Sequence, residues 1–296
     1  MVRRRRWVRA LVSRTGYDVQ RVRNGAWLLQ RSRGKRPPLR LQRIGSRDAG
    51  LVLLLDDDRS QKRMRQHRNE ISDYLAGEYL ARVLEKMRID CVLDVGANRG
   101  QFARRVRERG FTGRIVSFEP VSHLQADVRK AAAKDPGWFV LPYALGDTDG
   151  SAEIHVAGKM SSILGPTEFG KDWASGIRDS PTEAVEVRRL DSVLDEATAG
   201  LGNPRILLKL DTQGYDLQAF RGAGDRLADV SALLSEVSCV PIYDGMPRMP
   251  EQLSEYASAG FEISAMSPVS WHHKSLRVIE FDVLMVRPER VAGREI

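Results

Sequence analysis

The 296-residue sequence is poor in cysteine and contains no long apolar run. Its two cysteines, Cys91 and Cys239, lie in short apolar stretches, so we expect small core residues rather than a disulfide or a metal pair. No run approaches the roughly 18 apolar residues that span a bilayer. The N-terminus has the positive charges of a signal peptide but lacks its apolar stretch of about 7–15 residues. These absences predict a cytoplasmic protein.

Positive charge is concentrated at the N-terminus. Residues 1–47 contain fourteen arginines and one lysine against one aspartate, so the net charge of +8 is the sum of +14 there and −6 in residues 48–296. The stretch from Arg3 to Arg6, followed by Trp7, predicts either a short amphipathic helix at an anionic membrane surface or a basic tail, solvated or docked on the body. Such segments also bind nucleic-acid phosphates, but without an aromatic stacking platform this is the weaker alternative.

The composition divides the chain near residue 50. Residues 32–50 are rich in glycine, proline and polar residues and predict a loosely structured connector. We therefore predict a basic N-terminal extension and connector, residues 1–50, and a catalytic domain, residues 51–296. Within that domain residues 51–55 could form a strand, and residues 60–88 have the apolar spacing of a helix.

Strand-like and helix-like segments alternate from residue 91 onward, which predicts a mostly parallel, doubly wound α/β sheet. The expected core strands are 91–95, 114–118, 139–142, 205–210, 232–237, 261–265 and 278–286. Residues 152–157 and 185–190 alternate between polar and apolar side chains, so we expect extra strands in an insertion before the fourth core strand. Residues 158–182, between them, have the composition of a mobile loop.

A tight turn follows the first core strand, in the segment Cys-Val-Leu-Asp-Val-Gly-Ala-Asn-Arg-Gly at residues 91–100. Gly96 and Gly100 leave the backbone open to a ligand, and the first amides of the next helix can face that ligand. Glu119 stands at the end of the second strand, where a carboxylate can accept hydrogen bonds from both hydroxyls of a ribose. This pattern predicts a nucleotide-cofactor site.

The dinucleotide fingerprint Gly-x-Gly-x-x-Gly is absent, because Asn98 and Gln101 break it. Asp94, near the end of the strand, would repel a pyrophosphate but would suit a ligand that carries an ammonium and a sulfonium. S-adenosylmethionine is such a ligand, so the charges favour a methyl donor over NAD. An NAD-dependent oxidoreductase is the alternative, and an ordinary turn without a ligand is the simplest interpretation.

Four motifs resemble those of the FkbM-type methyltransferases. They are Asp-Val-Gly-Ala-Asn-Arg-Gly at 94–100, Phe-Glu-Pro at 118–120, Ala-Leu-Gly-Asp at 144–147 and Lys-Leu-Asp-Thr-Gln-Gly-Tyr-Asp at 209–216. The resemblance covers about residues 68–288, and the motif-bearing part is 91–288. It implies a Rossmann-like class I methyltransferase fold of seven strands, with an antiparallel last strand in a terminal hairpin. Many relatives carry Glu where this chain has Gln213, so an ionised group is not assumed there.

Ligands of open α/β sheets bind at the carboxyl ends of the strands, which places the cofactor residues. We assign one group to the methionine half of S-adenosylmethionine: Asp94, Gly96, Asn98 and Gly100. Glu119 is assigned to the ribose. Asp147 is assigned either to the adenine amino group or to an exposed turn.

The acceptor hydroxyl needs a group that orients it and takes its proton. Asp211 and Glu236 end neighbouring strands and are candidates for this role. They could act as base and positioning group, or hold a divalent ion such as Mg²⁺ that acidifies the hydroxyl, and we assign no metal ligand. Lys209 shares a side of its strand with Asp211 and could pair with a carboxylate. His273, next to His272, is the third candidate base.

We therefore expect an O-methyltransferase that acts on a hydroxyl of a sugar, a glycolipid or a secondary metabolite. A lipid-linked sugar is favoured, because the basic, Trp-containing N-terminus would suit peripheral contact with the inner membrane surface. Two alternatives are kept: an NAD-dependent oxidoreductase, and a nucleic-acid-binding protein that works through the Arg-rich arm.

Overall fold

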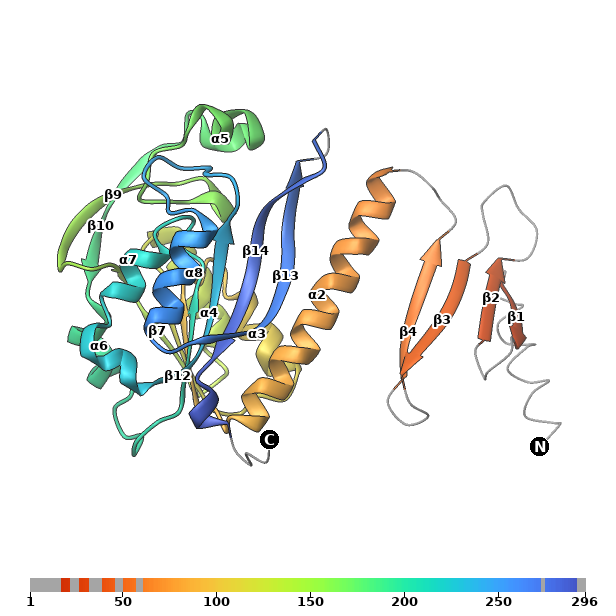
Figure 1. Ribbon diagram of the computed structural model, residues 1–296, viewed down its shortest axis with the longest axis horizontal. Coiled ribbons are helices and arrows are strands. Elements are labelled where there is room, and N and C mark those ends of the chain that lie inside the picture. The colour runs from red at the N-terminus through yellow and green to blue at the C-terminus, as the bar shows by residue number, and fades with distance from the viewer. Residues whose placement is uncertain are drawn as a thin grey trace. The chain divides into compact units, whose positions relative to one another are not determined.

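The computed structural model describes the backbone of residues 17–21, 27–31, 39–45, 50–56, 61–272 and 275–291 (Figure 1). The chain divides into two compact units, Met1–Tyr74 and Leu75–Ile296, and the division falls within helix α2 (Gln61–Lys86). Helix α2 matches the helix predicted over residues 60–88. The domain boundary expected at residue 50 stays a prediction. Within the described segments, no helix is long and apolar enough to cross a membrane.

The first unit contains two antiparallel strand pairs. β1 (Tyr17–Arg21) pairs with β2 (Trp27–Arg31), and β3 (Leu39–Gly45) pairs with β4 (Gly50–Asp56). The strand predicted at 51–55 is confirmed as part of β4. The prediction of a loose connector is wrong for residues 39–45, because their alternating leucines and polar residues suit a strand that pairs with the apolar β4. The Arg3–Arg6 segment lies outside the described residues.

The second unit is built on a seven-stranded sheet with the order β13-β14-β12-β11-β5-β6-β7. Its strands are β5 (Cys91–Val95), β6 (Arg114–Phe118), β7 (Trp138–Leu141), β11 (Ile206–Leu210), β12 (Val230–Ser238), β13 (Glu262–His272) and β14 (Arg277–Val286). Neighbouring strands from β12 to β7 run parallel, and β14 runs antiparallel to both β12 and β13. The predicted fold, a Rossmann-like class I methyltransferase sheet with an antiparallel last strand, is confirmed.

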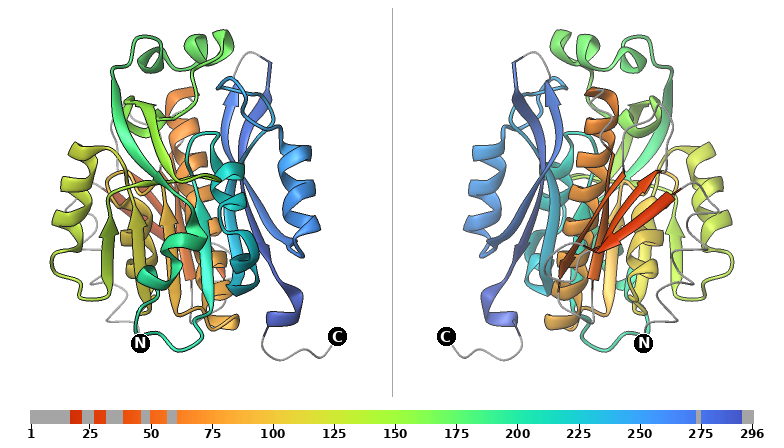
Figure 2. Two further views of the ribbon diagram at one scale, coloured as in Figure 1. Left: turned by 90° about the vertical axis from the view of Figure 1, so that its left-hand side faces the viewer. Right: turned by 90° about the vertical axis from the view of Figure 1, so that its right-hand side faces the viewer.

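Helices cover both faces of this sheet, as the two views of Figure 2 show. The core of one face contains residues of α2, α3 (Gln101–Glu108) and α4 (Ser122–Ala132). The core of the other face contains residues of α6 (Leu190–Ala197), α7 (Asp216–Arg221) and α8 (Met249–Ser258). Both cysteines are free thiols, and Cys91 is fully buried in the second of these cores.

A three-stranded sheet forms the insertion before β11. Its strand order is β8 (Ala144–Leu145), β10 (Thr182–Arg188), β9 (Gly150–His155), so the predicted insertion strands are confirmed. The segment between β9 and β10 is not the plain loop that we predicted. It contains α5 (Glu168–Trp173), because the Thr167 side chain accepts a hydrogen bond from Gly170 N and caps the helix.

Candidate active site

The turn after β5, residues 96–100, packs directly against the end of β11. Gly96 has a φ of 74°, and a Cβ atom there would lie 2.0 Å from the carbonyl oxygen of Asp211. Gly100, the N-cap of α3, has a φ of 72°, and its Cβ would meet the Trp138 ring at 2.8 Å. Both positions therefore require glycine, and the space that their missing side chains leave is filled by the protein itself.

Glu119 directly follows β6, the position that the sequence predicts, and it is hydrogen-bonded to the β5 turn. Its side chain is 4% exposed. Asn98 N donates a hydrogen bond of 2.6 Å to Glu119 Oε2, and Val121 N donates one of 3.0 Å to Oε1. Burial raises the pKa of the Glu119 carboxyl to about 7. Each carboxylate oxygen accepts one backbone hydrogen bond and keeps a lone pair for a ligand, which suits a pair of ribose hydroxyls.

Asp94 is fully buried beneath this turn. Its Oδ2 accepts a hydrogen bond of 3.1 Å from Ser117 Oγ, and its Oδ1 lies 3.0 Å from Lys209 Nζ. The carboxylate therefore neutralises an ammonium of the chain itself, which confirms the expectation that Lys209 could pair with a carboxylate. Direct contact between Asp94 and a bound methyl donor stays a prediction.

Asp147 belongs to the insertion sheet, in the loop after β8, rather than to the seven-stranded sheet. Its carbonyl oxygen accepts a hydrogen bond of 2.6 Å from Arg189 Nη1, and its Oδ1 accepts one of 3.4 Å from Thr148 Oγ1. The other predicted cofactor residues gather around the β5 turn. The assignment of Asp147 to adenine is a prediction that these contacts leave open.

Asp211 and Glu236, the predicted acceptor-side carboxylates, are joined by the side chain of Gln213. Gln213 Nε2 donates a hydrogen bond of 2.9 Å to Glu236 Oε2 and a longer one of 3.4 Å to Asp211 Oδ1. On the other side of the amide, Gln213 Oε1 lies 3.2 Å from Tyr243 Oη. The same hydroxyl lies 2.8 Å from Met160 O, so its single proton serves either acceptor.

The backbone of the turn after β11 fixes this arrangement. Gln213 has a φ of 55°, which is uncommon for a residue other than glycine. Its side chain is buried, and its carbonyl oxygen accepts a hydrogen bond of 2.7 Å from the buried Ser162 Oγ. Asp216, at the end of the same motif, accepts a hydrogen bond of 2.7 Å from Thr212 N. A strained residue with this many partners is typical of functional sites.

Two acids of β14, Glu280 and Asp282, were missed by the sequence analysis. Asp282 is the cross-strand partner of Glu236, and Glu280 is the partner of Ser238 on the same face. Glu280 Oε2 accepts a hydrogen bond of 2.9 Å from Ser270 Oγ, whereas Oε1 is buried without a hydrogen-bond partner among the described residues. The signal was available, because two acids spaced by two residues interrupt an otherwise apolar strand.

The pKa values of two of the acceptor-side acids, Glu236 and Glu280, are raised. Burial is the main cause for both Glu236 and Glu280, and the mutual proximity of acids adds to it. The pKa of Glu280 is raised to about 7, and that of Glu236 lies well above its ordinary value. The carboxyl group of Glu280 is therefore partly protonated at neutral pH.

One segment of the insertion, residues 158–162, connects the two halves of the site. Gly158 O accepts a hydrogen bond of 2.8 Å from Asn98 Nδ2 in the β5 turn. Ser162 and Met160 contact Gln213 and Tyr243 on the acceptor side, as described above. The loop that the sequence suggested as mobile is thus hydrogen-bonded to both the cofactor turn and the acidic group.

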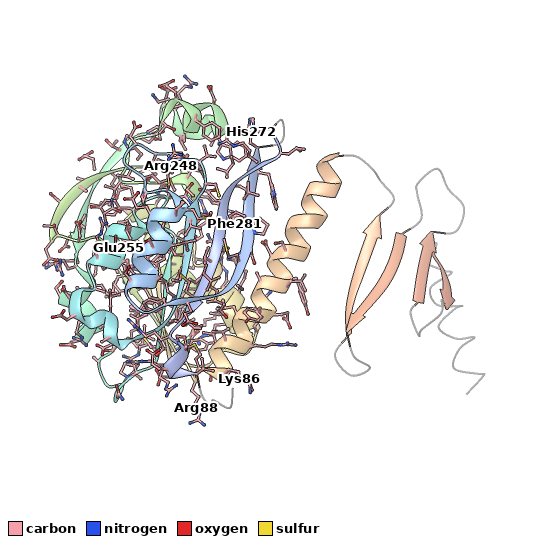
Figure 3. All side chains as sticks on the ribbon, viewed as in Figure 1. Lys86, Arg88, Arg248, Glu255, His272 and Phe281 are labelled. Carbon is pink, nitrogen blue, oxygen red and sulfur yellow. The ribbon has the colours of Figure 1, made fainter. Side chains whose placement is uncertain are left out.

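His273, the third predicted catalytic residue, lies outside the described residues. Its neighbour His272 stands at the tip of the β13–β14 hairpin, beside α5 (Figure 3). The His272 ring centroid is 6.1 Å from the centroids of both Phe169 and Trp173, and its Nδ1 is 2.7 Å from Ser275 Oγ. The hairpin tip and the insertion are therefore in aromatic contact.

A metal role for Asp211 and Glu236 gains no support from their geometry. Over the part of the chain that the structure describes, no group of three or more acidic, cysteine or histidine side chains is arranged to hold a metal ion. The participation of Mg²⁺ stays a hypothesis.

Comparison with known proteins identifies the family. The model described as the Methyltransferase FkbM domain matches residues 94–263, more than half of the chain. The 2-O-methyltransferase NoeI of Sinorhizobium fredii is 26% identical over 203 residues, which are 66% of this chain and 78% of that protein.

Solved structures are more distant. Fibrillarin from Aeropyrum pernix, in complex with natively bound S-adenosyl-L-methionine, has a TM-score of 0.40 and 13% identity over 92% of this chain and 94% of that one. Magnesium protoporphyrin IX methyltransferase from Synechocystis PCC 6803 has a TM-score of 0.42 and 10% identity over 79% and 86%. The assignment depends on the family match, which also rejects the oxidoreductase alternative. The chain belongs to the FkbM family of S-adenosylmethionine-dependent methyltransferases.

Proposed function

We propose that this enzyme transfers the methyl group of S-adenosylmethionine to a hydroxyl of a sugar. One observation carries the proposal. The pair of Asp211 and Glu236, bridged by Gln213, lies directly beside the β5 turn, because the main chain of Asp211 packs on Gly96. A hydroxyl bound to this pair would sit next to the donor. The similarity to a 2-O-methyltransferase supports oxygen as the acceptor atom.

The chain offers suitable residues for the methyl donor at the β5 turn. Glu119 would accept hydrogen bonds from the ribose hydroxyls through the lone pairs that its backbone contacts leave free. Asn98, held in a left-handed conformation with a φ of 52°, would shape the turn around the methionine half. When bound, S-adenosylmethionine supplies a methyl group already activated by its sulfonium, so the protein has only to orient the acceptor and remove a proton.

The acceptor oxygen gains the methyl group and loses its proton to the enzyme. We assign the proton to Asp211, the more open of the two acids, with a side chain that is 44% exposed. Glu236 has a raised pKa, holds its own proton more readily, and would serve as the hydrogen-bonding partner that orients the sugar. This division of roles needs two carboxyl groups in different environments. Asp211 is the more exposed of the two, and Gln213 donates its shorter hydrogen bond to Glu236.

We further propose a lipid-linked sugar as the acceptor, with the Arg-rich residues 1–47 in peripheral contact with the inner membrane surface. The support is the local charge of +14, which would attract the segment to anionic headgroups. Nucleic-acid binding by the same segment is the rival outcome, and the experiment below separates the two.

The test uses the purified full-length chain, methyl-tritiated S-adenosylmethionine and an extract of host cells in which methylation has been inhibited. Label is counted in the organic-solvent, polar-metabolite, protein and nucleic-acid fractions, with and without magnesium. We expect label in the organic fraction, and we expect acid hydrolysis to release that label as a mono-O-methyl sugar. Label confined to protein or nucleic acid would overturn the sugar acceptor while leaving the methyl donor in place.

Variants connect the label to the site. Asp211→Asn and Glu236→Gln should abolish labelling while S-adenosylhomocysteine binds as in the wild type. Asp244→Asn changes an exposed acid of the nearby loop and serves as the control, with labelling unchanged. Deletion of residues 1–47 should lower labelling of the lipid fraction more than that of water-soluble glycans. Equal labelling of both would remove the membrane proposal.

A further inference from the structure

The ammonium group of Lys209 is buried under the β5 turn, and its side chain is 6% exposed. Its Nζ lies 3.0 Å from Asp94 Oδ1, 3.1 Å from Val95 O and 3.0 Å from Gly96 O. The contacts with the two carbonyl oxygens are hydrogen bonds, and the contact with Asp94 is an ion pair. The centroid of the Phe102 ring lies 5.6 Å from Lys209 Nζ, which adds a cation–π contact.

Two of these contacts fix the backbone where the cofactor site begins. Val95 is the last residue of β5, and Gly96 opens the turn whose next residues reach Glu119 through Asn98 N. The Gly96 carbonyl lies beyond the last paired residues of β5 and β11, so the strand ladder does not hold it. Lys209 supplies the hydrogen bond that continues the ladder into the turn.

The same ammonium also reaches the acceptor side, since Asp211 Oδ2 lies 3.5 Å from Lys209 Nζ. Lys209 lies in β11, Asp211 directly follows that strand two residues further on, and Asp94 is the cross-strand partner of Lys209. One buried cation therefore contacts the donor turn through two carbonyl groups and the acceptor carboxylate through its charge.

A purely structural ion pair would not need this geometry. Buried ion pairs add little stability over apolar residues of similar volume, because desolvation offsets their attraction. An apolar pair at positions 94 and 209 could fill the core equally well, but it could not donate to the carbonyls of Val95 and Gly96.

We infer that Lys209 is a positioning residue, which holds the β5 turn in the conformation that binds S-adenosylmethionine and fixes Asp211 relative to that turn. Asp94 neutralises Lys209 and so permits its burial. The inference rests on the proposed use of the β5 turn as the donor site, and it is independent of the identity of the acceptor.

The experiment measures the affinity of the full-length chain for S-adenosylhomocysteine by calorimetry, which needs no acceptor. Lys209→Met alone would leave Asp94 buried without its cation and is expected to unfold, so both charges are removed together. The series is the wild type, then Asp94→Asn/Lys209→Gln, which keeps an amide donor at position 209, and then Asp94→Asn/Lys209→Met, which has no donor at that position. Circular dichroism and thermal unfolding establish that each variant is folded.

The chain offers a matched control at the opposite edge of the sheet. Arg107 pairs with Asp135 at 2.7 Å and donates to the carbonyl oxygens of Phe111 and Gly113, at the amino end of β6. Arg107→Met/Asp135→Asn therefore removes a cation, an anion and carbonyl contacts without touching the β5 turn. This control variant should lower the stability of the protein and leave its affinity for S-adenosylhomocysteine unchanged.

We expect affinity to fall along the series, by at least about tenfold in the Met variant, the factor that accompanies the loss of about 1.4 kcal/mol. Flat affinity along the series, or an equal loss in the Arg107 control, would overturn the positioning role and leave the methyltransferase assignment intact. Absence of binding by the wild type would instead contradict the use of this site for the donor.

Discussion

Gln213 Nε2 donates a hydrogen bond to Glu236 Oε2 across 2.9 Å, and this contact determines how the acceptor side of the site can be charged. An amide can donate to Glu236 and to Asp211 together, whereas a carboxylate at position 213 would repel both. Where relatives carry Glu at this position, Gln213 therefore replaces a negative charge beside Asp211 and Glu236 with a neutral hydrogen-bond donor. In this chain the two carboxyl groups that we propose as catalytic, Asp211 and Glu236, share a neutral bridge.

Replacing Gln213 with Glu should therefore destabilise the protein at high pH. The new carboxyl would be buried beside Asp211 and Glu236, so we expect a loss of about 2–4 kcal/mol in the free energy of unfolding at pH 8 and a smaller loss at pH 5, where carboxyl groups hold more protons. Urea unfolding at the two pH values measures the difference.

The exchange variant Gln213→Glu/Glu236→Gln is the control for this prediction. It restores the number of carboxyl groups and keeps an amide beside a carboxyl, so most of the lost stability should return. A single variant as stable as the wild type at pH 8 would mean that position 213 is not electrostatically coupled to Glu236.

Much of the fold was predictable from local patterns, because buried parallel strands are continuous apolar runs between turns. The segments 91–95 and 114–118 coincide with β5 and β6 for this reason. The joining of Glu119 to the turn and of Asp211 to Glu236 was predictable as well. Both pairs stand at the carboxyl ends of neighbouring strands, where topology brings them together.

Tertiary contacts decided what the sequence could not. Helix α5 depends on the Thr167 cap and on the packing of Phe169 and Trp173, and the overall composition of the segment, rich in glycine, serine and proline, reveals neither contact. The ion pair between Asp94 and Lys209 could not be foreseen as a specific pair, because the two residues are more than a hundred positions apart in the sequence. The two acids of β14 were visible in the sequence, but the antiparallel pairing of β14 with β12 is what places Glu280 and Asp282 beside Glu236.

Gly96 should tolerate no side chain. Gly96→Ala would combine a left-handed φ of 74° with a Cβ at 2.0 Å from Asp211 O, whereas Gly110→Ala has a φ of 91° and no neighbour within 4 Å. The second variant isolates the backbone cost of about 1–2 kcal/mol. We expect Gly96→Ala to lower the free energy of unfolding by about 2 kcal/mol more than Gly110→Ala does, because the end of β11 must move.

Chemical unfolding of both variants, with S-adenosylhomocysteine titrations, checks this. Gly96→Ala should weaken binding strongly, and Gly110→Ala should leave it unchanged. Equal losses of stability in the two variants would show that the close packing of the β5 turn on Asp211 is not maintained in solution.

Glu280 should make the protein less stable as the pH rises toward neutrality. Burial raises its pKa from 4.5 to about 7, so between these values the folded chain holds a proton that the unfolded chain has lost. The stabilisation is fully present below pH 4.5 and is lost as the pH rises through about 7. The raised pKa of Glu236 acts in the same direction.

Glu280→Gln should flatten this part of the stability profile, and Glu262→Gln, at an exposed position of β13, should not. The unfolding midpoint is recorded between pH 4.5 and 8.5. If the wild type and Glu280→Gln have parallel profiles, the carboxyl of Glu280 titrates normally and does not belong to the buried acidic group.

Glu119 should give donor binding its own pH dependence. Its pKa is raised to about 7, and the ionised carboxylate accepts hydrogen bonds from hydroxyls better than the protonated acid does. Affinity for S-adenosylhomocysteine should therefore fall as the pH decreases from 8 to 6, and Glu119→Gln should bind about tenfold more weakly at pH 8 with little pH dependence left. Calorimetry on both proteins at the two pH values provides the measurement.

Because Asn98 N and Val121 N already occupy one lone pair on each oxygen, an amide at position 119 would also place its NH₂ group against one backbone donor. Part of the loss at pH 8 would then reflect a disturbed turn, and only the loss of pH dependence reports the charge itself. A Glu119→Gln protein that kept the wild-type pH dependence would assign that dependence to another group and remove Glu119 as the ribose carboxylate.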